Sequence, residues 1–160
     1  MRHVEIHSFI PDAEANDVFD TLADFRHYAE LVDVVVSVDV EKHTDDNVHS
    51  SWVVKFRNGL LRWTEEDWFR RDKLRLDFSQ IEGDFDEFFG GWVLVAEPDG
   101  VKASLIVDFD FGVPSLASIV DPVAERVLTD VTKQILRGLF GEKVLFVDEA
   151  VEQVQQLAIA

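Results

Sequence analysis

Six consecutive segments of alternating apolar and polar residues fill the middle of this 160-residue chain, and they constrain its fold more than any other feature. Such alternation is typical of half-buried β-strands. Residues that favour turns, mostly Asp, Asn and Gly, separate neighbouring segments by only a few positions. Because strands joined by short turns pair antiparallel, the sequence predicts one antiparallel meander. The predicted strands cover residues 33–42, 47–57, 60–70, 73–81, 85–96 and 101–111.

Helical segments flank the meander. A further strand is predicted over 4–8, and two small helices follow it, over 13–25 and 26–31. After the meander, Asp121 and Pro122 form a helix-start signal, because proline suits the first helical turn. The apolar stripe that follows predicts a helix about 28 Å long, enough to cross a whole sheet. Its members are Val123, Val127, Val131, Ile135 and Leu139. We therefore expect an α+β fold in which a curved antiparallel sheet of about seven strands surrounds a long C-terminal helix.

Composition narrows the classes of function. The chain has 47% hydrophobic residues, including thirteen Phe and four Trp, which predicts a globular fold. Its formal charge of -17 would repel a phosphate backbone, so no nucleic-acid partner is expected. The same charge disfavours docking on an anionic membrane, and no apolar run reaches the roughly 20 residues of a membrane span. Because the chain has no cysteine, disulfides and thiolate chemistry are excluded.

The chain has no low-complexity linker and no internal repeat. We expect one domain over 1–142, with 143–160 as its C-terminal helical extension. The N-terminus lacks the features of a secretory signal, so a cytoplasmic location is expected. The protein is expected to be a monomer or a homodimer. The five histidines do not cluster at ligand spacings, and no phosphate-binding loop or nucleophile elbow occurs, so neither a metal nor a cofactor is expected.

Strand periodicity also predicts which residues point towards the long helix, because successive side chains of a strand point to opposite faces. The strand over 101–111 sets the parity, with apolar residues at every second position. The inward set comprises Val34, Val36, Val38 and Val40 in the first strand of the meander, Trp52, Val54 and Phe56 in the second, and Val101, Ala103, Leu105, Val107, Phe109 and Phe111 in the last.

The strand over 60–70 carries charge on both faces. Trp63 favours an inward face that also holds Glu65 and Asp67. Two carboxylates at positions i and i+2 lie roughly 6 to 7 Å apart, and burial would raise at least one pKa. Such a pair is a candidate general acid and base.

An alternative orientation of this strand stays open. A β-bulge after Gly59 would exchange the two faces, so that Thr64, Glu66 and Trp68 turned inward. Ion pairs with arginines of a neighbouring strand would also explain the carboxylates.

Large apolar side chains of the predicted interior are candidates for contact with a flat hydrophobic ligand. Tyr28, near the end of the second small helix and beside the expected cavity entrance, is a third candidate catalytic group through its hydroxyl. The predicted substrate-binding residues are Trp52, Trp63, Phe78, Phe88, Trp92, Phe109, Val127 and Val131.

Element order and four motifs carry a resemblance to a known superfamily. The chain resembles the polyketide cyclase and StAR-related lipid-transfer (SRPBCC) superfamily from about residue 2 to 140, in the branch of bacterial aromatase/cyclases, coenzyme Q-binding proteins and ribosome-association toxins. The resemblance implies a helix-grip fold with a hydrophobic cavity. The motifs are R-H-V-E-I (2–6), D-F-R-H-Y (24–28), E-G-D-F-D-E-F-F-G-G-W (82–92) and D-F-D-F (108–111).

The resemblance implies either of two functions, and the sequence leaves open whether the protein is an enzyme. The first is an aromatase/cyclase-like protein that binds a poly-ketone chain, delivered by an acyl carrier protein, and promotes aldol cyclisation and dehydration. The second is a non-catalytic carrier of a quinone, lipid or pigment. Trp63 matches an inward tryptophan of the aromatase/cyclases, whereas Glu65 and Asp67 occupy the positions of a small polar residue and an arginine. The charge disfavours a ribosome partner, and Ala29 replaces a proline of the quinone-binding branch.

Overall fold

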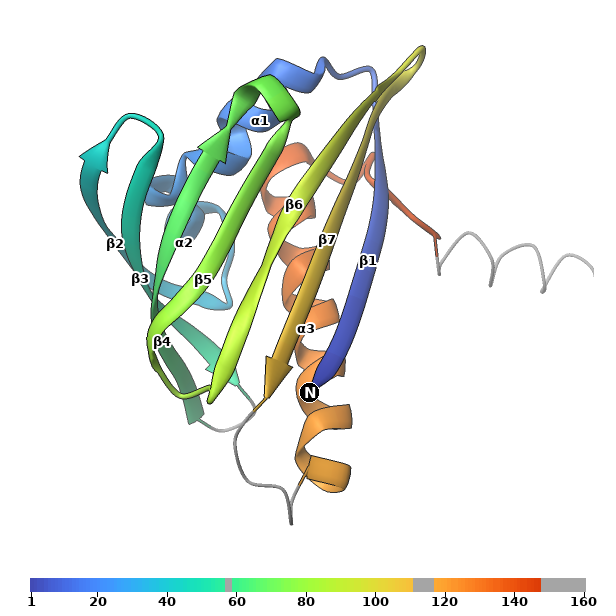
Figure 1. The fold of residues 1–160 in the computed structure, drawn as a ribbon. Coiled ribbons are helices and arrows are strands. Elements are labelled where there is room, and N and C mark those ends of the chain that lie inside the picture. The colour runs from blue at the N-terminus through green and yellow to red at the C-terminus, as the bar shows by residue number, and fades with distance from the viewer. Residues whose placement is uncertain (57–58, 111–116, 148–160) are drawn as a thin grey trace, which may run out of the picture.

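The computed structural model describes residues 1–56, 59–110 and 117–147, with the backbone alone for 117–121. Its strands form one antiparallel sheet in the order β2-β3-β4-β5-β6-β7-β1-β8. The sheet curves around the long helix α3, and the short helices α1 and α2 close one end (Figure 1). The strands are β1 (Arg2–Pro11), β2 (Val35–Thr44), β3 (Asn47–Phe56), β4 (Gly59–Arg70), β5 (Arg75–Gly83), β6 (Glu87–Glu97), β7 (Gly100–Asp110) and β8 (Leu145–Phe146). The helices are α1 (Ala15–Ala23), η1 (Phe25–His27), α2 (Tyr28–Leu31), η2 (Arg71–Lys73) and α3 (Ala117–Phe140).

This architecture is the predicted helix-grip fold, with eight strands where about seven were expected. The additional strand is β8, whose two residues pair with Ser8 and Phe9 of β1. It lies within the segment 143–160 that was predicted to be helical. Residues 148–160 of that predicted extension lie outside the described part of the chain.

Helix α3 begins earlier than predicted. Its first residue is Ala117, so Pro122 lies in the second turn and not in the first. Proline has no N–H, and the helix therefore lacks one backbone hydrogen bond at that point. The Asp-Pro pair marks the neighbourhood of the helix start, but it does not define the first turn.

A β-bulge in β2 corrects the predicted inward position of Val36, whereas Val34, Val38 and Val40 pack against the core as predicted. Val35 pairs with Val54 and Ser37 pairs with Val53, which leaves Val36 without a partner in the ladder. The extra residue offsets the alternation by one position at the start of the strand. Val36 is consequently 47% exposed, and Val35 takes the inward position. The predicted inward residue Phe111 lies outside the described residues.

The core fills the space between the concave face of the sheet and α3. One cluster of buried side chains joins β1, β5, β6 and β7 to α1, and a second joins β2 and β3 to η1 and α2. Leu136 and Val131 of α3 belong to the first and second cluster respectively. Helix α3 therefore holds both halves of the sheet together. Among the described residues, no helix is both long and apolar enough to cross a membrane.

Candidate functional site

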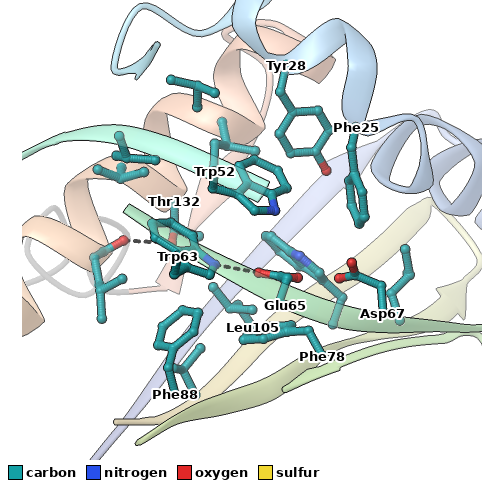
Figure 2. Close-up of a pocket in the computed structure, with 18 residues that line it drawn as sticks. Phe25, Tyr28, Trp52, Trp63, Glu65, Asp67, Phe78, Phe88, Leu105 and Thr132 are labelled. Carbon is teal, nitrogen blue, oxygen red and sulfur yellow. Dashed lines mark hydrogen bonds between the residues drawn. The ribbon is translucent and has the colours of Figure 1, made fainter. Parts of the chain in front are cut away.

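A cavity of about 100 Å³ lies where the two core clusters meet, between the sheet and α3 (Figure 2). Fifteen of its eighteen lining residues are aromatic or aliphatic, and the other three are Glu65, Asp67 and Thr132. The aromatic lining residues are Phe25, Tyr28, Trp52, Trp63, Phe78, Phe88 and Trp92. The wall is thus apolar except for one small polar region.

The size of the cavity limits what enters without a change of shape. A dry apolar cavity of about 150 Å³ holds one benzene molecule. This cavity is smaller, so a ligand of several rings requires wall side chains to move.

Strand β4 positions the carboxyl groups of Glu65 and Asp67 on its inner face. Glu65 is 5% exposed and Asp67 is 2% exposed, and Leu61 on the same face is also buried. The inward orientation predicted from Trp63 is the one that β4 adopts. The alternative, with Glu66 and Trp68 inward, does not occur.

A chain of hydrogen bonds fixes both carboxyl groups. The Trp63 indole Nε1–H donates to Glu65 Oε1 over 2.7 Å. The Ser50 hydroxyl donates to Asp67 Oδ2 over 2.6 Å, and Trp52 Nε1–H donates to Ser50 Oγ over 2.8 Å. Trp52 and Trp63 are cross-strand partners whose rings stack 6.0 Å apart. The two indoles therefore orient the carboxyl groups, Trp63 directly and Trp52 through Ser50.

Burial sets the protonation of this pair. Loss of hydration raises the pKa of Glu65 well above its ordinary value, and the neighbouring Asp67 charge raises it further. Burial also raises the pKa of Asp67, to about 6, although hydrogen bonds from Glu65 and Ser50 oppose the rise. Both carboxyl groups therefore hold their protons to higher pH than they would in water, and Asp67, with a pKa of about 6, is ionised at neutral pH. Two carboxyl groups with raised pKa values thus lie side by side.

Tyr28 lines the cavity, but its hydroxyl is engaged elsewhere. It donates to the Leu22 carbonyl oxygen over 2.6 Å. Burial raises the pKa of Tyr28 well above its ordinary value, and the nearby Glu65 and Asp67 charges add to the rise. Tyr28 therefore stays neutral, and its proton is already bound to the backbone.

The structure places most of the predicted substrate-binding residues on the cavity wall, and two elsewhere. Phe109 is fully buried against Phe85, with ring centroids 6.1 Å apart, and it does not reach the cavity. Val127 packs against the core beside the lining residue Val131 and is not part of the wall. The predicted residues that do line the cavity are Trp52, Trp63, Phe78, Phe88, Trp92 and Val131.

Sequence reasoning missed Ser50, which is fully buried and connects Trp52 to Asp67. A signal was present, because Ser50 shares the parity of Trp52, Val54 and Phe56 and is thus a polar residue on an inner face. Phe25 and Thr132 also line the cavity without having been predicted. Among the residues described, no cluster of three or more His, Asp or Glu side chains is arranged to hold a metal ion.

Fold and site together define a helix-grip protein with a largely apolar internal cavity. The chain belongs to the polyketide cyclase / dehydrase and lipid transport family, whose model matches residues 11–135. No curated protein matches the chain.

Solved structures share this architecture. The protein TTHA0849 from Thermus thermophilus is 25% identical, with a TM-score of 0.79, and the match covers 89% of this chain and 96% of that one. The Zhui aromatase/cyclase from a Streptomyces species is 19% identical, with a TM-score of 0.71 and coverage of 89% and 93%. A STAR-related lipid transfer protein from Xanthomonas axonopodis is 15% identical, with a TM-score of 0.63 and coverage of 87% and 85%.

Proposed function

We propose that this protein binds a hydrophobic poly-ketone in its cavity and promotes aldol cyclisation and dehydration, with Asp67 as general base and Glu65 as general acid. One observation supports this most directly: two buried carboxyl groups with raised pKa values lie together in an otherwise apolar wall. Two titratable groups whose pKa values are driven apart are typical of acid and base pairs.

Each chemical step needs only these two groups. Asp67 removes a proton from a carbon between two carbonyl groups, and the resulting enolate carbon attacks a second carbonyl carbon of the same chain. Glu65 gives its proton to the alkoxide oxygen that forms. In the dehydration, a carboxylate removes a second α-proton, and the acid protonates the departing hydroxyl, which leaves as water. Exclusion of water from the apolar wall favours both steps.

A substrate delivered by an acyl carrier protein is part of this proposal. Such carriers are acidic, and the charge of -17 would repel them. Docking is therefore expected to be weak and to strengthen with added salt, because salt screens the repulsion between like charges.

A non-catalytic carrier of a hydrophobic molecule is the second candidate. The observation that favours it is the apolar character of the wall, since fifteen of eighteen lining residues would serve a passive ligand equally well. In a carrier, the carboxyl pair would only orient the ligand.

Turnover of a candidate poly-ketone thioester by matched variants separates the two candidates. Native mass spectrometry first establishes whether the purified protein retains an apolar ligand. Chromatography then measures cyclised product for wild type, Glu65→Gln and Asp67→Asn. The control is Glu66→Gln, which alters the next carboxyl of β4 on the outer face, where Glu66 contacts His49.

The proposal expects a loss of at least about a hundredfold in either inner variant, in line with general acid–base catalysis, and little change in the control. Full turnover in both inner variants contradicts the catalytic role. A retained ligand without turnover by wild type supports the carrier.

A further inference from the structure

Most hydrogen-bond donors of the cavity wall are already engaged by the protein, whereas the Trp92 indole N–H forms no hydrogen bond with the described residues. Trp63 donates to Glu65, and Tyr28 donates to the Leu22 carbonyl oxygen. The Thr132 hydroxyl donates to the carbonyl oxygen of Leu128, one turn earlier in α3. The Glu65 carboxyl, when it carries its proton, forms a hydrogen bond with Asp67. A ligand that needs donors finds few in this wall.

Acceptors are available at the same place. Asp67 is ionised near neutral pH, and an ionised carboxylate accepts about four hydrogen bonds through its two oxygens. The Ser50 hydroxyl and the Glu65 carboxyl occupy part of this capacity. A hydrogen bond between a ligand hydroxyl and the remaining lone pairs would be charge-assisted, and such bonds are stronger than neutral ones.

Positive charge is missing from the wall. Among its described residues there is no Lys, Arg or His. A ligand carboxylate or phosphate would therefore lie close to the Asp67 charge without a counterion, where few water molecules screen the repulsion. The formal charge of -17 acts in the same direction at longer range, since it lowers the local concentration of anions.

We propose that the cavity selects uncharged hydrophobic molecules whose polar group donates a hydrogen bond to Asp67, such as phenols and enols, and that it rejects carboxylates and phosphates. This inference rests on the proposed function in that both place the ligand in the same cavity, but it does not require catalysis. The inferred selectivity also agrees with the proposed reaction, because 1,3-diketones enolise and their aromatised products are phenols. Fatty acids and phospholipids are excluded as ligands.

Three single-ring probes test the selectivity, because they require less movement of the wall than a ligand of several rings does: phenol, anisole and benzoate. At about pH 7.5 phenol is neutral, benzoate is ionised and Asp67 carries its charge. Titration followed by protein NMR measures the three dissociation constants. We expect phenol to bind about tenfold or more tightly than anisole, the ratio for a hydrogen bond to a charged group, and benzoate to show no saturable binding.

Asp67→Asn changes the selectivity in a defined way. An amide offers a donor as well as an acceptor and has no charge. The preference for phenol over anisole should fall, and benzoate should bind more tightly than it does to wild type. Glu66→Gln on the outer face should reproduce the wild-type ratios. Each ratio of dissociation constants is measured within one variant whose fold has been confirmed. A general loss of stability would therefore not produce the expected change in selectivity.

Three outcomes overturn the inference: equal binding of phenol and anisole to wild type, binding of benzoate as tight as that of phenol, or no binding of any probe. The proposed function fails separately. Selective phenol binding without turnover of a poly-ketone leaves the selectivity intact and removes the catalysis. Turnover by a protein that also binds benzoate as tightly as phenol overturns the selectivity alone.

Discussion

Glu65 and Asp67 are almost completely buried, and burial of charge affects stability as well as chemistry. The pKa of Asp67 in the folded protein, about 6, lies above its ordinary value of 3.8. The folded state therefore binds this proton more tightly than the unfolded state does. The resulting contribution to stability is complete below about pH 4 and is lost as the pH rises through about 6. The raised pKa of Glu65 acts in the same direction.

The first prediction concerns the pH dependence of unfolding. We expect the free energy of unfolding of wild type to fall by about 3 kcal/mol or more between pH 4 and 7, relative to the double variant Glu65→Gln, Asp67→Asn, which lacks both groups. Urea denaturation across this pH range provides the measurement. Parallel profiles for the two proteins would show that neither carboxyl is perturbed.

Ser50 provides a second prediction. In Ser50→Ala the buried Trp52 Nε1–H loses its acceptor and Asp67 loses a donor, so unfolding should become easier by about 1–3 kcal/mol. Ser51→Ala is the matched control, because Ser51 shares a hydrogen bond with the partly exposed Thr64 on the opposite face, where water replaces it. Equal destabilisation of the two variants in urea would contradict a special role for Ser50.

At the scale of elements, the close contact between α3 and α2 depends on Gly138. A Cβ at this position would lie 2.5 Å from the Leu31 carbonyl oxygen. Glycine to alanine in a helix normally stabilises by about 1 kcal/mol. Here the backbone clash should outweigh that gain, because the carbonyl of α2 has no room to move without separating the two helices.

We therefore expect Gly138→Ala to lower the thermal midpoint. The control is Gly59→Ala, whose effect should be small because its Cβ would meet, among the described residues, only the Phe56 carbonyl oxygen, at 3.8 Å. Differential scanning calorimetry of both variants measures the difference. A higher midpoint for Gly138→Ala than for wild type would be inconsistent with the close approach of these helices.

Sequence periodicity predicted most elements because burial on one face imposes it. The meander, the long helix and the inward face of β4 all follow from apolar residues at regular spacing, and the inward position of Glu65 and Asp67 follows from Trp63 beside them. Alternation cannot show which face a residue occupies where consecutive residues are all apolar. Val34, Val35 and Val36 are all valines, so the hydrophobic pattern could not predict the bulge in β2.

Cavity lining was harder to predict than strand faces. Parity places Phe109 on the inner face, but the adjacent loop covers it with Phe85. Gln80 holds that loop through hydrogen bonds to the Phe85 backbone, a contact between side chain and main chain that strand patterns do not contain. The hydroxyl of Tyr28 is likewise bound by a carbonyl group six residues earlier. Such contacts depend on tertiary structure and not on periodicity.

At the scale of the whole molecule, charge is the dominant property. A formal charge of -17 on 160 residues makes the folded state repel itself, and salt screens this repulsion. We expect the thermal midpoint to rise as sodium chloride increases from about 20 to 300 mM, by several degrees. Scanning fluorimetry of the tryptophans measures the thermal midpoint at each salt concentration. A midpoint that falls with salt would indicate that ion pairs such as Arg2–Glu125 outweigh the net repulsion.

The whole account depends on one proton shared by two buried carboxyl groups beside an apolar cavity. Carbon-13 NMR of the Glu65 and Asp67 side-chain carboxyl carbons, followed through a pH titration, measures this state directly. We predict two separated transitions, one near pH 6 and one well above the ordinary pKa of glutamate, both absent from the double variant. Titration of both carbons near pH 4 would mean that the pair is hydrated and independent, and it would contradict the proposed acid and base.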